Sequence, residues 1–200
     1  MAPLPLSPLT ELDAVNEILL SIGEAPVNTL DVAGIRDVSI ARSRLHGASR
    51  NVQTRGWSWN KDEGYVLSPD VNNHVLIADN VLHVDPCDDR LDFVVRRDPN
   101  DQTMKLWDRE NNTFEITEPV EVDIIWFHAF EDIPQAARNY IAVRAGRLFQ
   151  TQIIGARILF EFTALHEREA YALLRAVEAR SKDRNFFRAP TAANRIVHRR

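Results

Sequence analysis

The 200-residue sequence has one cysteine and few glycines, and both shortages exclude kinds of site. The single cysteine, Cys87, can form neither an intramolecular disulfide nor a multi-cysteine zinc site, which fits a reducing compartment. The 7 glycines form no GxGxxG or GxxxxGK phosphate loop. His166-Glu167 lacks the second histidine of a zinc-protease helix, and Gly56-Trp57-Ser58 lacks the second glycine of a nucleophile elbow. We therefore expect no cofactor, no metal site and no catalytic residue, and thus a protein that is not an enzyme.

Long apolar runs are also missing. No stretch approaches the roughly 20 apolar residues that a membrane span needs, so we expect no membrane partner. The chain begins with alternating prolines over residues 3–8, where a signal peptide would carry a basic end and an apolar run. With 44% hydrophobic and 26% charged residues, the composition predicts a globular protein, made in a cytoplasm, that buries its core without disulfides.

The net charge of −5 hides an uneven distribution of charge along the chain. Residues 62–132 carry eighteen acidic and five basic side chains, whereas residues 180–200 carry seven basic side chains and one acidic one. A basic tail on an acidic body suggests an acidic partner, and two phenylalanines between arginines could anchor it. The alternative is a frayed, solvated terminus. The candidate docking residues are Arg184, Phe186, Phe187 and Arg188.

Hydrophobic periodicity predicts an α+β fold, in which a bundle of about four helices carries an inserted small antiparallel β-sheet. A capping-box pattern at Thr10 and Asp13 begins the first helix, and Gly23 follows its end. A second helix is expected from about Asp37 to Arg55, with an apolar stripe of Val38, Ala41, Leu45, Ala48 and Val52. Alternation of apolar and polar residues then predicts strands, interrupted at Pro119, with one face made by Leu91, Phe93 and Val95 and another by Phe114, Ile116, Val120, Val122, Ile124 and Trp126. Pro134 begins the third helix, whose stripe is Ala137, Tyr140, Ile141, Ala145, Leu148 and Phe149. The last helix, from about Arg157 to Arg180, carries the apolar residues Phe162, Leu165, Ala170, Leu173, Leu174 and Val177. The expected parts are an N-terminal helical part (1–62), a β-rich insertion (63–130), C-terminal helices completing the bundle (131–182) and a basic tail (183–200).

Several residues that could carry chemistry have more ordinary alternatives. Asp85, Asp88 and Asp89 around Cys87 could hold a cation weakly, but a solvated turn is the stronger interpretation. Trp57 and Trp59 follow a helix end, where they either stack on sugars or bases or, as we favour, seal the junction of helices and sheet. The six histidines are scattered over different predicted elements, which does not favour a shared site.

Several segments resemble one protein family closely. They cover most of the chain up to about residue 180, and the first two are the most specific. The segments are Leu12–Leu30 (LDAVNEILLSIGEAPVNTL), Gln53–Asn60 (QTRGWSWN), Glu63-Gly64, Leu67–Asp70, Trp107–Arg109, Ile133-Pro134, Arg147–Gln150 and Gly155-Ala156. Together they resemble tail tubular protein A, the adaptor or gatekeeper of podoviruses similar to phage T7.

The resemblance implies a structural virion protein of the phage tail, built as a helical bundle with a β-rich insertion. It implies a homo-oligomeric ring of twelve copies that joins the portal protein to the tail nozzle (tail tubular protein B), with tail fibres attached nearby. Such a head-tail connector continues the DNA channel, holds the genome before DNA ejection and lets it pass without specific binding.

Two alternatives stay open at the level of the sequence. A virion-associated carbohydrate hydrolase would use a carboxylate pair in the β-rich part, with one raised-pKa carboxyl group facing an aromatic platform. A head-completion or tail-terminator ring from another virus type would share ring formation but bind different neighbours.

Overall fold

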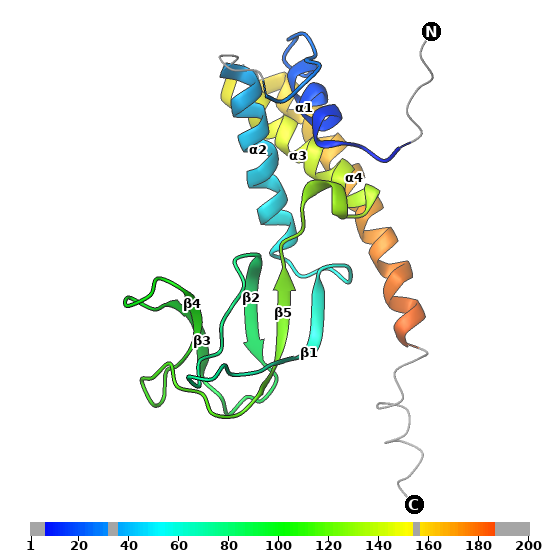
Figure 1. Ribbon diagram of the computed structural model, residues 1–200. Coiled ribbons are helices and arrows are strands. Elements are labelled where there is room, and N and C mark those ends of the chain that lie inside the picture. Colours follow the sequence, from blue (N-terminus) through cyan, green and yellow to red (C-terminus); the bar gives the residue numbers. More distant parts are fainter. Residues whose placement is uncertain (1–6, 32–35, 154–156, 187–200) are drawn as a thin grey trace, which may run out of the picture. The chain divides into compact units, whose positions relative to one another are not determined.

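The computed structural model describes residues 7–31, 36–153 and 157–186, and side chains from 153 to 163 and beyond 181 lie outside the described part (Figure 1). The chain divides into two compact units: a helical unit of Met1–Ser49 with Ala129–Arg200, and a β unit of Arg50–His128. Within the described residues, four α-helices and two small antiparallel sheets make the fold class α+β, which confirms the prediction. No helix of the described residues has the length and apolar character to span a membrane.

Helix α1 (Glu11–Leu20) begins at the predicted capping box. The Thr10 hydroxyl accepts a hydrogen bond from the Asp13 amide (3.2 Å), and the Asp13 carboxylate accepts one from the Thr10 amide (3.1 Å), so two otherwise unpaired donors are satisfied. Past the end of the helix, Gly23 adopts a φ of 86°, which favours glycine. The face of α1 that enters the core consists of Ala14, Val15, Ile18 and Leu19.

Helix α2 (Arg36–Gln53) contributes residues 36–49 to the helical unit. Its buried stripe follows the predicted helical spacing and consists of Val38, Ala41, Leu45 and Ala48. Arg42 and His46 both contact the Glu11 carboxylate, at 2.8 and 2.7 Å, and so link α2 to the first turn of α1. The pKa of Glu11 is lowered, because these two contacts outweigh the effect of desolvation.

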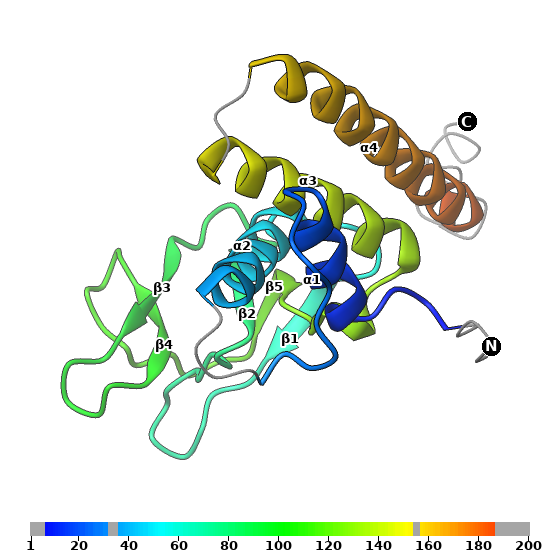
Figure 2. The ribbon, with the colours of Figure 1, turned by 90° about the horizontal axis from the view of Figure 1, so that it is seen from above.

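Helices α3 (Gln135–Ile153) and α4 (Arg157–Phe186) follow the short 3-10 helix η1 (Phe130–Asp132), and α3 packs against both α1 and α4 (Figure 2). Arg144 and Arg147 of α3 form ion pairs with the buried Glu167 of α4. The predicted stripe of α3 is buried at Ala137, Tyr140, Ile141, Ala145 and Phe149. Its member Leu148, by contrast, is 38% exposed.

The β unit contains a three-stranded antiparallel sheet in the order β1-β5-β2, formed by Lys61–Leu67, Val120–Trp126 and Val81–Pro86. Strands β3 (Phe93–Arg97) and β4 (Met104–Asp108) form a separate two-stranded sheet. Pro119 immediately precedes β5, where the sequence predicted an interruption. The core shared by these strands and the intervening loops consists of Val75, Ile77, Val84, Leu106, Ile116, Val120, Val122 and Ile124.

Two parts of the predicted strand pattern differ in the structure. Leu91 was expected to share a strand face with Phe93, but it is exposed in the turn before β3. Phe114 and Ile116 keep the alternation of β5 without forming a strand, because only isolated bridges hold this segment, at Thr113 and Glu115. For Phe114 and Ile116, the alternation of apolar and polar residues therefore predicted which side chains are turned away from solvent, but not whether the backbone forms a hydrogen-bonded strand.

Candidate assembly surfaces

Six carboxylates of the β unit have lowered pKa values. The pKa is lowered at every carboxylate of this unit that shows a shift, namely Asp70, Asp88, Asp98, Asp101, Asp108 and Asp123. At Asp88, hydrogen bonds from Arg90 lower the pKa to about 2, and at Asp123 the Lys61 ammonium, 2.7 Å away, is the main cause. A glycosidase acid needs the opposite shift, because it must keep its proton near neutral pH.

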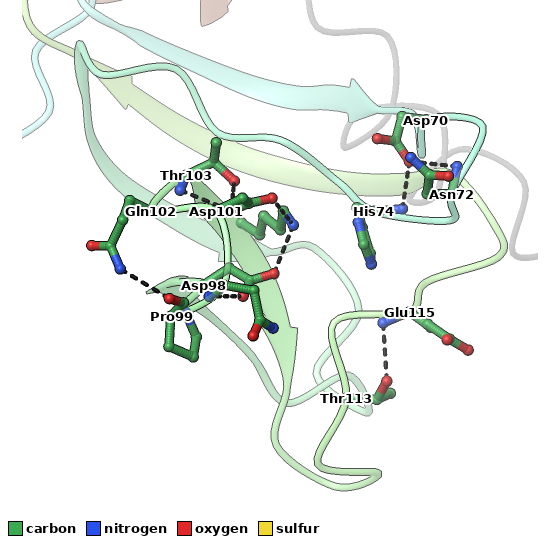
Figure 3. Close-up of polar contacts among 12 residues, drawn as sticks. Asp70, Asn72, His74, Asp98, Pro99, Asp101, Gln102, Thr103, Thr113 and Glu115 are labelled. Atoms are coloured by element: carbon green, nitrogen blue, oxygen red, sulfur yellow. Dashed lines mark hydrogen bonds and ion pairs between the residues drawn. The ribbon is translucent and has the colours of Figure 1, made fainter.

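A buried ion cluster fixes the turn between β3 and β4 (Figure 3). The Lys105 ammonium lies 2.7 Å from Asp98 and 2.6 Å from Asp101, and its side chain is only 3% exposed. Asp98 also accepts a hydrogen bond from the Asn100 amide (2.9 Å). Because each carboxylate already has a cation or an amide as partner, these acidic side chains serve the turn rather than a free ligand site.

The turn at Asp70 is built in a similar way. One carboxylate oxygen of Asp70 accepts hydrogen bonds from the amides of Asn72 and His74, both at 2.8 Å (Figure 3). A short bridge pairs His74 with Glu115 of the neighbouring segment. The local side-chain-to-backbone bonds favour this turn over a continued strand.

The acidic residues around Cys87 form no ligand cluster. No group of three histidine, cysteine or acidic side chains within the described residues has the geometry to hold a metal. Asp88 is engaged by Arg90 at 2.6 Å, as expected of a solvated turn. Desolvation and a hydrogen bond to Asp123 raise the pKa of the Cys87 thiol, which disfavours the reactive thiolate.

The segment Gln53–Asn60, which carries one of the most specific resemblances, forms a hydrogen-bonded turn at the end of α2. The Asn60 side chain is buried, donates to the carbonyls of Gln53 (2.9 Å) and Trp126 (2.8 Å), and accepts from the Trp57 amide (2.8 Å). The fully buried Gln53 amide exchanges two hydrogen bonds with the backbone of His128, at 2.9 and 2.8 Å. Two amide side chains therefore tie the end of α2 to the end of β5.

Of the two tryptophans in this turn, one is clearly structural. Trp57 is 5% exposed and its indole donates to the Val52 carbonyl at 2.7 Å, so it packs at the end of α2 and leaves little surface for stacking on a sugar or base. Trp59 is half-buried beside His128, with ring centroids 6.5 Å apart. The sequence did not reveal the amide pair Gln53 and Asn60, although a buried turn needs such groups to satisfy its backbone.

The helical unit contains a pocket of about 300 Å³ that the sequence did not predict. Helices α1, α3 and α4 all contribute to its wall. The contributing side chains include Glu17, Ile18, Val143, Gln150 and His166. Gly146 of α3 also lines it, and a β-carbon there would lie at ordinary van der Waals distance, 3.8 Å, from Ile18.

The four residues predicted to dock on a partner cannot be placed. Arg184 and Phe186 fall in the last turn of α4, whose side chains lie outside the described residues. Phe187 and Arg188 lie wholly outside the described residues. Docking through these side chains stays a prediction.

A family model described as "Tail tubular protein" matches residues 12–184, a span that includes every helix and strand of the structure except the first residue of α1 and the last two of α4. The chain belongs to the tail tubular protein family. Membership makes the protein a structural component of a bacteriophage tail and thus of the virion. No curated protein sequence matches this tail tubular protein.

Proposed function

We propose that this tail tubular protein is the adaptor of a short-tailed phage, forming a ring of twelve copies between the portal protein and the tail nozzle. The observation that carries the proposal is the family match over residues 12–184, which spans both units. In this proposal the ring continues the DNA channel, acts as gatekeeper until DNA ejection, and provides the attachment region for tail fibres. The protein is made in the host cytoplasm and acts without enzymatic activity.

The distribution of charge supports this role. Residues 62–132, which include most of the β unit, carry eighteen acidic and five basic side chains. An acidic channel wall repels DNA phosphates, so the genome slides without sticking, whereas a basic wall would bind it. We propose that acidic side chains of the β unit line the channel. We also propose that the functional parts of the chain are residues 1–62, 63–130, 131–182 and 183–200.

The basic tail is the proposed portal-docking element, through Arg184, Phe186, Phe187 and Arg188. Arginine and aromatic side chains are the commonest anchors of protein interfaces, and here they follow one another in a polar terminus. A chain truncated after Lys182 should bind the portal at least about tenfold more weakly, as expected for the loss of an anchor cluster. Unchanged affinity would exclude the tail as the docking element.

The carbohydrate hydrolase has no comparable support. The two requirements stated for it were a raised-pKa carboxyl group in the β-rich part and an aromatic platform facing it. The shifted carboxylates of the described β unit are all lowered in pKa, and Trp57 is buried. No observation therefore favours a second function.

The test is the mass of the full-length protein by light scattering, alone and after mixing with a portal ring. A twelve-subunit particle, or monomers that join the portal in twelve copies, is the expected result. A monomer that ignores the portal would overturn the adaptor proposal. Twelvefold binding to a portal would also separate an adaptor from a tail-terminator ring.

A further inference from the structure

The pocket of the helical unit contains a buried hydrogen-bond acceptor that lacks a donor. The Gln150 amide donates to the Ser21 carbonyl (2.6 Å), but its oxygen is buried and accepts no hydrogen bond within the described part of the chain. The Glu17 carboxylate on the same wall forms no ion pair among the described residues. Partial desolvation raises the pKa of Glu17. A buried acceptor without a donor is costly, so this pocket favours a ligand that donates hydrogen bonds.

The rest of the pocket wall narrows the chemistry of that ligand. Ile18 and Val143 supply apolar surface, which suits an aliphatic stem below a polar head. Arg147, the cation on the wall, is held by the buried Glu167 of α4. An arginine side chain meets these requirements, because its stem is apolar and its guanidinium carries five donors and no acceptor.

The same unit presents such an arginine on its surface. Arg175 of α4 is exposed and forms no ion pair within the described residues. Its neighbours along the helix surface, Ala172 and Ala179, are small and exposed, so another molecule can approach the helix closely. Leu165, which is 52% exposed, extends this surface with an apolar side chain.

The pocket and the arginine face opposite directions around α4. His166 lies on the pocket wall, and Arg175 follows nine residues later, about two and a half turns at 3.6 residues per turn. The two side chains therefore project from opposite flanks of the helix. Complementary patches on opposite flanks join copies head to tail, and this geometry builds open filaments or, where the rotation between copies closes, rings, rather than isologous pairs.

We infer that the pocket lined by Glu17 and Gln150 receives Arg175 from α4 of a second copy of this chain. The inference rests on the proposed ring and names the residues that join one copy to the next. The guanidinium donates to the Glu17 carboxylate and the Gln150 oxygen, while its stem covers Ile18. The occupant is a second copy because one molecule presents both the arginine, Arg175, and the acceptors of the pocket, Glu17 and Gln150, on opposite flanks.

Charge reversal tests the inference, with self-association of the full-length chain measured by sedimentation velocity over a range of concentrations. Glu17→Lys and Arg175→Glu should each weaken association at least about thirtyfold, because each replaces an attractive contact by a repulsive one. An equimolar mixture of the two variants should associate again, since each then meets a neighbour of opposite charge. Arg180→Glu, an equal change on another part of the exposed surface of α4, is the matched control and should have little effect.

The possible results separate this inference from the proposed function. Oligomers that are unaffected by Arg175→Glu, or two weakened variants that fail to recover on mixing, would overturn the pocket contact and leave the ring in place. A wild-type chain that stays monomeric at every concentration would also overturn the pocket contact. If that monomer still joined a portal in twelve copies, the adaptor proposal would survive without it. Circular dichroism of each variant establishes that the helices are intact.

Discussion

The Asn60 side chain offers the sharpest test of how the turn after α2 is stabilised. It is 2% exposed and makes three hydrogen bonds, with the carbonyls of Gln53 and Trp126 and the amide of Trp57. Asn60→Ala removes all three, and two of them, to the Gln53 carbonyl and from the Trp57 amide, are fully buried. At about 1 kcal/mol per net hydrogen bond, with a further penalty for unsatisfied groups, we expect a loss of about 3–5 kcal/mol in the free energy of unfolding.

The measurement is urea unfolding followed by tryptophan fluorescence. All four tryptophans, Trp57, Trp59, Trp107 and Trp126, belong to the β unit, so the signal reports that unit specifically. The expected loss corresponds to a midpoint lower by about 2 M urea for a typical small-domain slope.

Two further variants decide whether hydrogen bonding is the cause of the loss. Asn60→Asp keeps the acceptor for the Trp57 amide but cannot donate to the two carbonyls, so it should be at least as harmful as alanine. Asn72→Ala, an exposed amide in a turn of the same unit, is the control and should change stability by less than about 0.5 kcal/mol. A loss below about 1 kcal/mol for Asn60→Ala would refute the reasoning, because three buried bonds cannot then be contributing.

Two other predictions concern the same unit. Gly56→Ala should lower the free energy of unfolding of the β unit by about 2–4 kcal/mol in the same urea titration, since φ is 67° and a β-carbon would lie 2.9 Å from Ile125. Gly47→Ala, in the part of α2 that belongs to the helical unit, meets nothing within 4 Å and should leave this fluorescence transition unchanged, so an equal effect would contradict the clash. The free energy of unfolding should fall as the pH drops below 3.8, because the hydrogen bond from Lys105 lowers the pKa of Asp98 in the folded state. The Asp98 carboxylate therefore stabilises the fold above its unfolded-state pKa, and this stabilisation is lost as the pH falls through its folded-state pKa. The pKa of Lys105 is raised, so its contribution to stability should persist up to pH 10.5 and decline at higher pH. Fluorescence-monitored pH titration should show this window, and an Asp98→Asn variant with an identical profile would contradict the assignment.

Signals confined to a few neighbouring residues were read correctly from the sequence. The capping box at Thr10, the positive φ at Gly23 and the interruption at Pro119 all occur where predicted. Each depends on local backbone chemistry: a side chain that reaches its own helix end, a residue without a β-carbon, or a residue without an amide proton. The helix periodicity of α2 was also correct, because one long apolar stripe needs only one partner surface.

Positions that depend on a partner element were less predictable. Leu165 and Leu173 of α4 were assigned with its apolar residues, yet both are more than half exposed. The buried side of α4 carries Glu167 and Glu178 beside the predicted Ala170 and Leu174. An acidic residue is buried at Glu167 because Arg144 and Arg147 of α3 compensate its charge, and sequence spacing alone cannot show that pairing.

The sequence by itself determined the fold class, the family and the types of local element, because each is set by composition, by periodicity or by motifs of neighbouring residues. Only the tertiary structure decided which distant residues meet. It paired β1 with β5 across more than fifty residues, brought Asn60 to the Trp126 carbonyl, and assembled a pocket from three helices. Such contacts arise when the apolar faces of several helices and strands are buried at the same time. A given pattern of apolar and polar residues can be buried in more than one arrangement, so the pattern alone does not determine the contacts.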